Sequence, residues 1–140
     1  MSTDLQVLEP LPPLEVLYDA MLKLPQAELP TLHYFADGMY LRWLFCPKGA
    51  LIIGREHKRA HFFLVLSGAI QVGREVYTPP KVIVSTPGTQ RAGLALQDSV
   101  CVTIHRTQVT DLAAIEEELL EPDPKSPFGV GNRLKALEAP

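Results

Sequence analysis

The sequence predicts an all-β domain, an antiparallel β-barrel or jelly-roll sandwich with a short helix toward each end. Between residues 39 and 105 the chain consists of short runs rich in β-branched and aromatic residues, separated by turns that contain Gly or Pro. No stretch of helical periodicity separates these runs, so the crossover helices of a parallel sheet are not expected. The length of 140 residues suits a single domain.

The predicted strands are bounded by turn sequences such as Pro47-Lys48-Gly49, Ser67-Gly68 and Thr86-Pro87-Gly88. Runs so short and so evenly spaced are typical of antiparallel sandwiches and barrels. The strands are expected at residues 39–46, 50–55, 61–66, 69–72, 81–85, 91–96 and 99–105.

Helical spacing flanks this β-rich part on both sides. Residues 14–23 carry apolar side chains at helical intervals after a proline-rich start, and an extended lead-in follows through His33. A second helix is expected after Thr110, a plausible N-cap, with Asp111 at the positive end of its dipole and Pro122 as its stop.

We therefore expect an N-terminal helix and lead-in over residues 1–38, a β-core over 39–106, a C-terminal helix over 107–121 and a Pro/Gly-punctuated tail over 122–140. The tail is either loose or an arm that ties onto a neighbour. In the second case it would bury Phe128, Val130, Leu134 and Leu137.

The composition describes an ordinary soluble globule, with 46% apolar and 21% charged residues and a net charge of −3. This balance does not favour nucleic acid, and no apolar stretch is long enough to cross a bilayer. The first residues lack the basic and apolar regions of a secretory signal. Cys46 and Cys101 lie in apolar runs and are expected to be buried thiols, so we expect a cytoplasmic protein.

Two glycines, Gly49 and Gly68, bracket a run that contains His57 and His61. This run resembles the first motif of the cupin superfamily, in which Gly is followed after five residues by His-x-His, then after three or four by Glu, and after six more by Gly. Every interval is kept. His57 stands at the second histidine position, whereas Arg55 stands at the first and His61 at the glutamate position.

The stretch from Thr86 to Ala95 resembles the second cupin motif, Pro-x-Gly-x-x-His-x-x-x-Asn, with Arg91 at the histidine position and Ala95 at the asparagine position. The resemblance spans about residues 39 to 105 and implies a cupin-type fold. The layout with flanking helices is similar to small cupins of bacterial and phage genomes. Cupins hold a metal at the mouth of the barrel and bind small molecules there. An enzyme of this kind would carry out metal-assisted oxygenation or isomerisation of a small acid or sugar.

One hypothesis for the function is a divalent metal held by His57 and His61, with His105 as the third donor that such sites need. An all-histidine set suits Zn²⁺, Fe²⁺ or Ni²⁺ better than the hard cations. Strand alternation argues against His105. If Val100, Val102 and Ile104 form the core set of the last strand, His105 turns outward.

The alternative is a metal-free basic pocket in a non-catalytic binding or assembly module. Arg55 and Arg91 stand where cupins aim their ligands, and arginine clamps carboxylate or phosphate instead of binding a cation. Such a pocket suits a small anionic ligand. A third interpretation is that the fold serves only as a scaffold, with His57 and His61 in an exposed basic turn.

Alternation also predicts which strand faces are buried. Leu41, Trp43 and Phe45 are expected in the core, with Tyr40 and Arg42 on the opposite face. The run at residues 62–66 is apolar on both faces, so its outward face needs a cover. The terminal helices or a second subunit could provide it, and we expect a homodimer partly covered by the termini.

Overall fold

The computed structural model describes residues 9–135. Along the chain, one helix is followed by nine strands, then by a second helix and a short 3₁₀ turn. The helices are α1 (Leu14–Leu22) and α2 (Leu112–Leu119), and the 3₁₀ turn covers Val130–Asn132. The strands are β1 (Thr31–Ala36), β2 (Met39–Cys46), β3 (Leu51–Ile53), β4 (His61–Ser67), β5 (Ile70–Val72), β6 (Glu75–Tyr77), β7 (Lys81–Ser85), β8 (Ala92–Ala95) and β9 (Ser99–Arg106).

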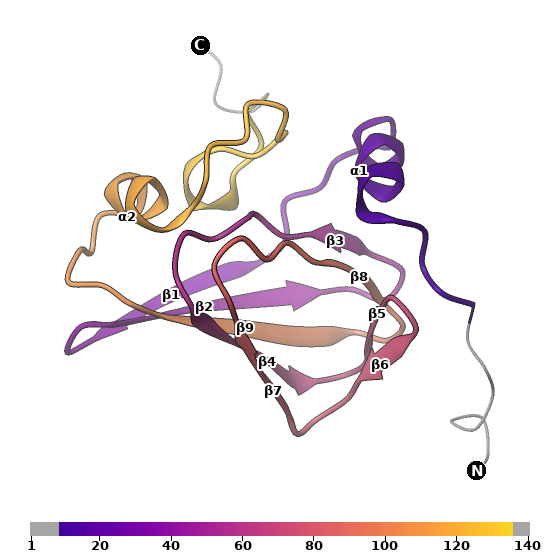
Figure 1. Ribbon diagram of the computed structural model, residues 1–140, viewed down its shortest axis with the longest axis horizontal. Helices are drawn as coiled ribbons and strands as arrows, with labels where there is room; N and C mark the ends of the chain where they lie inside the picture. Colours follow the sequence, from indigo (N-terminus) through magenta and orange to yellow (C-terminus); the bar gives the residue numbers. More distant parts are fainter. Residues whose placement is uncertain (1–8, 136–140) are drawn as a thin grey trace.

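The strands form two antiparallel sheets (Figure 1). The larger sheet has the order β1-β2-β9-β4-β7 and the smaller one the order β3-β8-β5-β6. The two sheets remain separate, so of the two predicted forms, barrel and jelly-roll sandwich, the structure has the sandwich. The fold class is thus confirmed as all-β with short flanking helices.

Two strands were not predicted, and both belong to hairpins. The lead-in forms β1, which pairs with β2 through a turn at Asp37-Gly38, where both residues have positive φ. Asp-Gly between alternating apolar residues is a strong signal for a two-residue hairpin loop. The short strand β6 pairs with β5 in the same manner, across a turn that begins at Gly73.

The core between the sheets contains Leu44, Cys46, Val65, Ile70 and Cys101. Both cysteines are free and buried, as expected. Cross-strand partners share a face, so the registers place Tyr40 with His105, Arg42 with Thr103, and Leu44 with Cys101 on this inner side.

The predicted faces of β2 and β9 are therefore wrong. Leu41, Trp43 and Phe45 lie on the outer side of the large sheet, opposite Ile104, Val102 and Val100. The apolar side of each strand is the outer one, because the inner side borders a cavity and carries polar residues.

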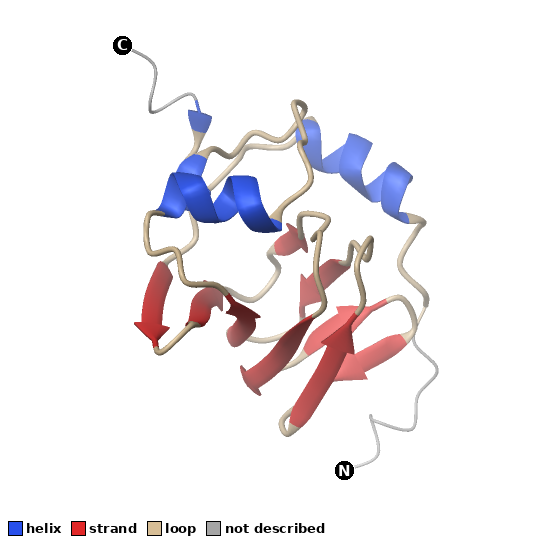
Figure 2. Cartoon of the chain, turned by 60° about the vertical axis from the view of Figure 1, so that its left-hand side comes forward, coloured by secondary structure: helices blue, strands red, loops and turns tan. Residues whose placement is uncertain are grey.

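The two helices and the C-terminal segment lie together at one end of the sandwich (Figures 1 and 2). Helix α2 is capped by Asp111, whose carboxylate accepts a hydrogen bond from the Ala114 amide at 3.0 Å, and not by the predicted Thr110. Ile115 and Leu119 bury its apolar face against Tyr40. No helix of residues 9–135 is long and apolar enough to span a membrane.

The described part of the C-terminal segment is an arm on its own chain. The Gly131 amide donates to the Glu116 carboxylate at 2.6 Å, and Arg133 pairs with Glu28 at 2.8 Å. Tyr18 of α1 donates its hydroxyl to Asp123 at 2.5 Å. These contacts hold the arm and α1 over the inner face, whereas Leu137, a predicted anchor, lies outside the described residues.

Candidate functional site

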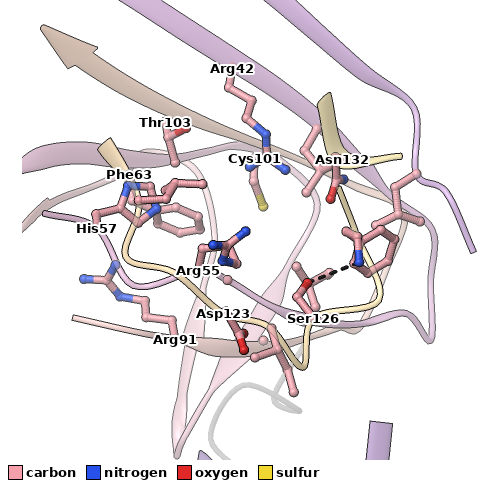
Figure 3. A pocket seen from close by; sticks show the side chains of 18 of the residues that line it. Arg42, Arg55, His57, Phe63, Arg91, Cys101, Thr103, Asp123, Ser126 and Asn132 are labelled. Carbon is pink, nitrogen blue, oxygen red and sulfur yellow. Dashed lines mark hydrogen bonds between the residues drawn. The ribbon is translucent and has the colours of Figure 1, made fainter. Parts of the chain in front are cut away.

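A cavity of about 440 Å³ lies beneath the helices and the arm, within the range of small-molecule sites. Its walls come from the inner faces of β2, β3, β4 and β9, from the loop before β8, and from α2 and the arm. Figure 3 shows Arg42, Arg55 and Cys101 pointing into this space, with His57 at one side and Ser126 and Asn132 at the other. A cavity with so many polar side chains explains why the inner face of the sheet is not wholly apolar.

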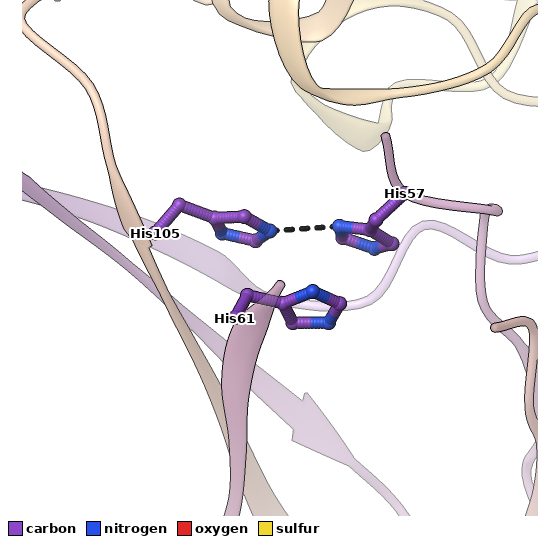
Figure 4. Close-up of side chains that lie close together, drawn as sticks. All are labelled: His57, His61 and His105. Atoms are coloured by element: carbon purple, nitrogen blue, oxygen red, sulfur yellow. Dashed lines mark hydrogen bonds between the residues drawn. The ribbon is translucent and has the colours of Figure 1, made fainter. Parts of the chain in front are cut away.

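Three histidines from three segments meet at one wall of the cavity (Figure 4). His57 lies in the loop after β3, His61 begins β4, and His105 lies near the end of β9. His57 Nδ1 and His105 Nε2 are 2.7 Å apart and share a hydrogen bond. The ring centroids are 4.0–4.8 Å apart, and one nitrogen from each ring lies within 4.8 Å of the others.

The environment keeps all three rings neutral near pH 7. Burial lowers the pKa of His57 to about 2 and that of His105 to about 3, and the neighbouring His61 and Arg42 add to both shifts. Burial also lowers the pKa of His61. The Nδ1 of His61 lies 3.2 Å from the Arg59 carbonyl oxygen, which can only accept, so this nitrogen carries the proton and leaves Nε2 with a free lone pair.

Three buried polar atoms lining this cavity lack a hydrogen-bond partner among residues 9–135. They are His105 Nδ1, Thr103 Oγ1 and Arg55 Nε. Buried polar atoms are nearly always paired, and leaving one unpaired costs about 1–3 kcal/mol. All three belong to residues that line the cavity.

Three arginines make the cavity basic. Arg55 donates to the Glu121 carbonyl at 2.7 Å, and Arg91 donates to the Ser85 hydroxyl at 2.7 Å while its guanidinium lies 5.5 Å from the centroid of the Phe63 ring. Burial lowers the pKa of Arg42. Within the described part of the chain none of the three forms an ion pair with a carboxylate. Their charge is available to an anionic ligand.

The structure brings the three predicted metal donors together and places both predicted ligand-binding residues, Arg55 and Arg91, at the same cavity. The expectation that His105 turns outward is wrong, since it is 5% exposed and bonded to His57. Arg42 was not predicted as a site residue, although it lines the cavity. Tyr40 and Arg42 lie two positions apart on β2, as Thr103 and His105 do on β9, so each pair shares one face of its strand. Only the register between β2 and β9 shows that the two faces lie on the same side of the sheet. His33, expected to be structural, bonds Tyr40 at 2.6 Å.

The lowered pKa values of His57 and His105 predict that the free energy of unfolding of the metal-free protein decreases on mild acidification. Below pH 6.5 the unfolded chain binds protons at His57 and His105, whereas the folded chain does not until about pH 3. Stability therefore falls with pH, by up to about 1.4 kcal/mol per pH unit for each ring, or about 3 kcal/mol for the pair between pH 6.5 and 5. Urea unfolding of chelator-treated protein across this range measures the slope. If the free energy of unfolding changes with pH equally steeply in a His57→Gln, His105→Gln variant, the two histidines do not cause the effect and the prediction is wrong.

No protein-family model matches the sequence, and no curated protein is similar to it in sequence. Solved structures match in fold. The structure of KdgF from Halomonas sp. has a TM-score of 0.51 at 14% identity, over 60% of this chain and 84% of that chain.

Two further matches have TM-scores below 0.5. An RmlC-like cupin protein from Ralstonia eutropha matches at 0.48 with 15% identity, over 57% of each chain. The structure of Rhodobacter sphaeroides SigE in complex with the anti-sigma ChrR matches at 0.49 with 15% identity, over 59% of this chain and 46% of that chain. The chain thus spans only about half of these two proteins.

The likeness concerns the fold alone. Gly49 and Gly68, the glycines of the cupin motif, both adopt the positive φ that glycine favours, and the two antiparallel sheets form a jelly roll. The chain is a small protein with a cupin-type jelly-roll fold.

Proposed function

We propose that this protein binds a small anionic molecule in its cavity through a divalent transition metal held by His57, His61 and His105. The observation that carries the proposal is the meeting of three imidazoles at one cavity wall, with His61 and His105 buried and His57 partly buried. Neutral nitrogen donors are what Zn²⁺, Fe²⁺ and Ni²⁺ require, and three protein donors leave a position open for a ligand. Free buried thiols agree with the reducing cytoplasm that we expect.

The donor set fits such an ion in chemistry and in place. The hydrogen bond between His57 and His105 can form only while one of its two nitrogens keeps a proton, so a metal would replace that bond. When bound, the metal would supply a Lewis acid that polarises an oxygen of the ligand. The side chains that line the cavity would orient the ligand and exclude water from it.

The arginines decide the class of ligand. Arg42 and Arg55 each lower the pKa of His57 through their charge, so both guanidinium groups act on the histidine cluster. A second positive charge beside a divalent cation is unfavourable unless an anion lies between them. A small carboxylic acid or sugar acid meets this requirement, with its carboxylate on an arginine and another oxygen on the metal.

Metal analysis of protein purified without a His-tag tests the metal part of the proposal. Near-stoichiometric Zn, Fe or Ni is expected in the wild type, and its loss is expected in a His57→Ala, His61→Ala variant. His33→Ala is the matched control, because His33 is the one histidine of the chain's four that lies outside the cluster. Protein that takes up no metal after incubation with all three ions would sink this part of the proposal.

The second candidate function is anion binding without metal in a non-catalytic module. It is favoured by the three cavity arginines, which lack carboxylate partners within residues 9–135. The two candidates differ in what chelation does to ligand binding.

In chelator-treated protein, small carboxylates or phosphate at about 100 times their Kd should stabilise the fold by about 2.7 kcal/mol. Arg42→Gln or Arg91→Ala should weaken that binding at least about tenfold, since each removes a charged contact. A thermal-shift titration measures this, with Arg74→Gln in the exposed β5–β6 turn as control. Anion binding seen only with metal present would favour the metal proposal over this one.

A further inference from the structure

The two cysteines of the chain lie next to each other on the inner face of the large sheet. Cys46 ends β2, and Cys101 lies in the neighbouring strand β9. Leu44 pairs with Cys101 and Cys46 pairs with Ser99, so the two cysteines are diagonal neighbours on one face. Both belong to the same buried cluster between the sheets. Their thiol groups share a hydrogen bond, which brings the two sulfur atoms into contact.

Cys101 is the member of the pair that reaches the cavity. Cys46 is 0% exposed and lies behind the cavity wall, whereas Cys101 is 7% exposed and forms part of that wall. Figure 3 shows the sulfur of Cys101 pointing into the space beside Arg42. The register agrees, because Arg42 pairs with Thr103, two positions from Cys101 on the same face. A small molecule in the cavity therefore meets one thiol directly, and the second thiol lies behind the first.

The charge of Arg42 favours ionisation of this pair. The hydrogen bond between the thiols lowers the pKa of Cys46 and raises that of Cys101, so one proton is shared between the two sulfur atoms when the pair ionises. Burial raises the pKa of both thiols, and the guanidinium of Arg42 lowers both. A neighbouring cation promotes the thiolate, which is the form of cysteine that oxidants attack.

We propose that Cys101 and Cys46 are a redox pair, in which hydrogen peroxide entering the cavity oxidises Cys101 and Cys46 then closes a disulfide. In the first step the Cys101 sulfur attacks one peroxide oxygen, the O–O bond breaks, and water leaves a sulfenic acid on Cys101. In the second step the Cys46 sulfur attacks the Cys101 sulfur, and the S–O bond breaks. The hydroxyl group leaves as water with the thiol proton of Cys46. The two thiols are oxidised to one disulfide, and the peroxide is reduced to water.

The placement of Cys101 is what a purely structural pair does not explain. Buried cysteines are commonly small apolar residues of a core, and that role accounts for Cys46. Cys101 instead has its sulfur at a cavity wall, beside a cation and in contact with a second thiol. Because paired strands already hold the two sulfur atoms in contact, closing the bond brings together no distant parts of the chain. The redox pair needs neither a metal nor a ligand in the cavity.

Thiol counting by mass spectrometry tests the proposal in chelator-treated wild-type protein, where no bound metal contributes to the chemistry of peroxide. The protein is exposed to hydrogen peroxide while folded, then unfolded and treated with iodoacetamide. Untreated protein should take up two labels, one for each cysteine of the chain, and oxidised protein none. Its mass should fall by about 2 Da at the peptide that joins Cys46 to Cys101, and dithiothreitol should restore both labels.

Three results of this experiment would overturn the proposal. The first is two labels after exposure to peroxide, which would mean that the thiols do not react in the folded protein. The second is a loss of labels that dithiothreitol does not reverse, because a disulfide is reducible. The third is a disulfide between two copies of the chain in place of the bond between Cys46 and Cys101.

Reciprocal alanine variants test the order of the two steps. In Cys46→Ala the oxidised Cys101 has no partner, so its sulfenic acid should persist and be trapped by dimedone. In Cys101→Ala the remaining thiol is fully buried and should keep its iodoacetamide label without a dimedone adduct. Circular dichroism checks that each variant folds, and the wild-type result does not depend on either. Equal dimedone labelling of the two folded variants would refute the assignment of Cys101 as the thiol that peroxide attacks.

Discussion

Adding Zn²⁺ to the metal-free protein should raise its Tm by about 8 °C, and His105→Ala should lose that rise. An ion at about 100 times its Kd stabilises the fold by about 2.7 kcal/mol, and a domain of this size gains about 3 °C per kcal/mol. Without His105 two imidazoles remain, too few to hold the ion tightly. His105 gives the sharpest test of the cluster, because alternation on β9 predicted that its side chain points away from His57 and His61, whereas in the structure it is buried.

The comparison is made within each variant, with and without Zn²⁺, by scanning calorimetry. His105→Ala changes the stability of the metal-free protein as well, since it empties a buried position. The rise on adding Zn²⁺ is independent of that change. His33→Ala should keep the full rise, because His33 bonds Tyr40 and is not part of the cluster. An undiminished rise in His105→Ala would mean that any ion binds elsewhere.

Gly68→Ala should destabilise the protein by at least about 4 kcal/mol, a large part of the stability of an ordinary domain. Gly68 has φ +85°, where a side chain is strained. A Cβ there would lie 2.7 Å from the Ser99 Cα and closer still to the Ser99 hydroxyl and the Asp98 carbonyl. Those are atoms of β9 and of the turn before it, which cannot move without disturbing the centre of the large sheet.

Gly49→Ala is the matched control for this substitution. Gly49 is the other glycine of the motif and has a similar φ of +89°, but a Cβ there would meet nothing within 4 Å. Only the backbone strain remains, about 1–2 kcal/mol. Urea unfolding of both variants separates the two effects. Equal losses would show that φ alone accounts for both glycines and that the contact with Ser99 relaxes.

Strand positions were the most predictable part of this molecule. Short β-branched runs between Gly and Pro turns located seven of the nine strands, because such runs fit a pleated surface and the turn residues break it. Strand β1 was predicted only as an extended lead-in through His33, although Asp37-Gly38 is typical of a two-residue hairpin loop. The glycine spacing from Gly49 to Gly68 correctly indicated the cupin fold.

Strand faces were predicted less well. The rule that the apolar side of a strand faces the core gave the wrong side for both β2 and β9. It failed because this sheet has an apolar outer face and a partly polar inner one, the reverse of the usual arrangement for an antiparallel sheet beside water. The same error hid Arg42 and turned His105 away from the histidine cluster.

By itself the sequence determined local features: where seven of the nine strands lie, and that His57, His61, Arg55 and Arg91 lie near one pocket. These features depend on residues that are neighbours in the chain, so the local sequence is enough to predict them. Only the tertiary structure decided that His105 and Arg42 join them and that Trp43 faces outward. A side chain's face depends on which strand pairs with it and in what register. Register is fixed by contacts between residues far apart in the sequence, as between Tyr40 and His105.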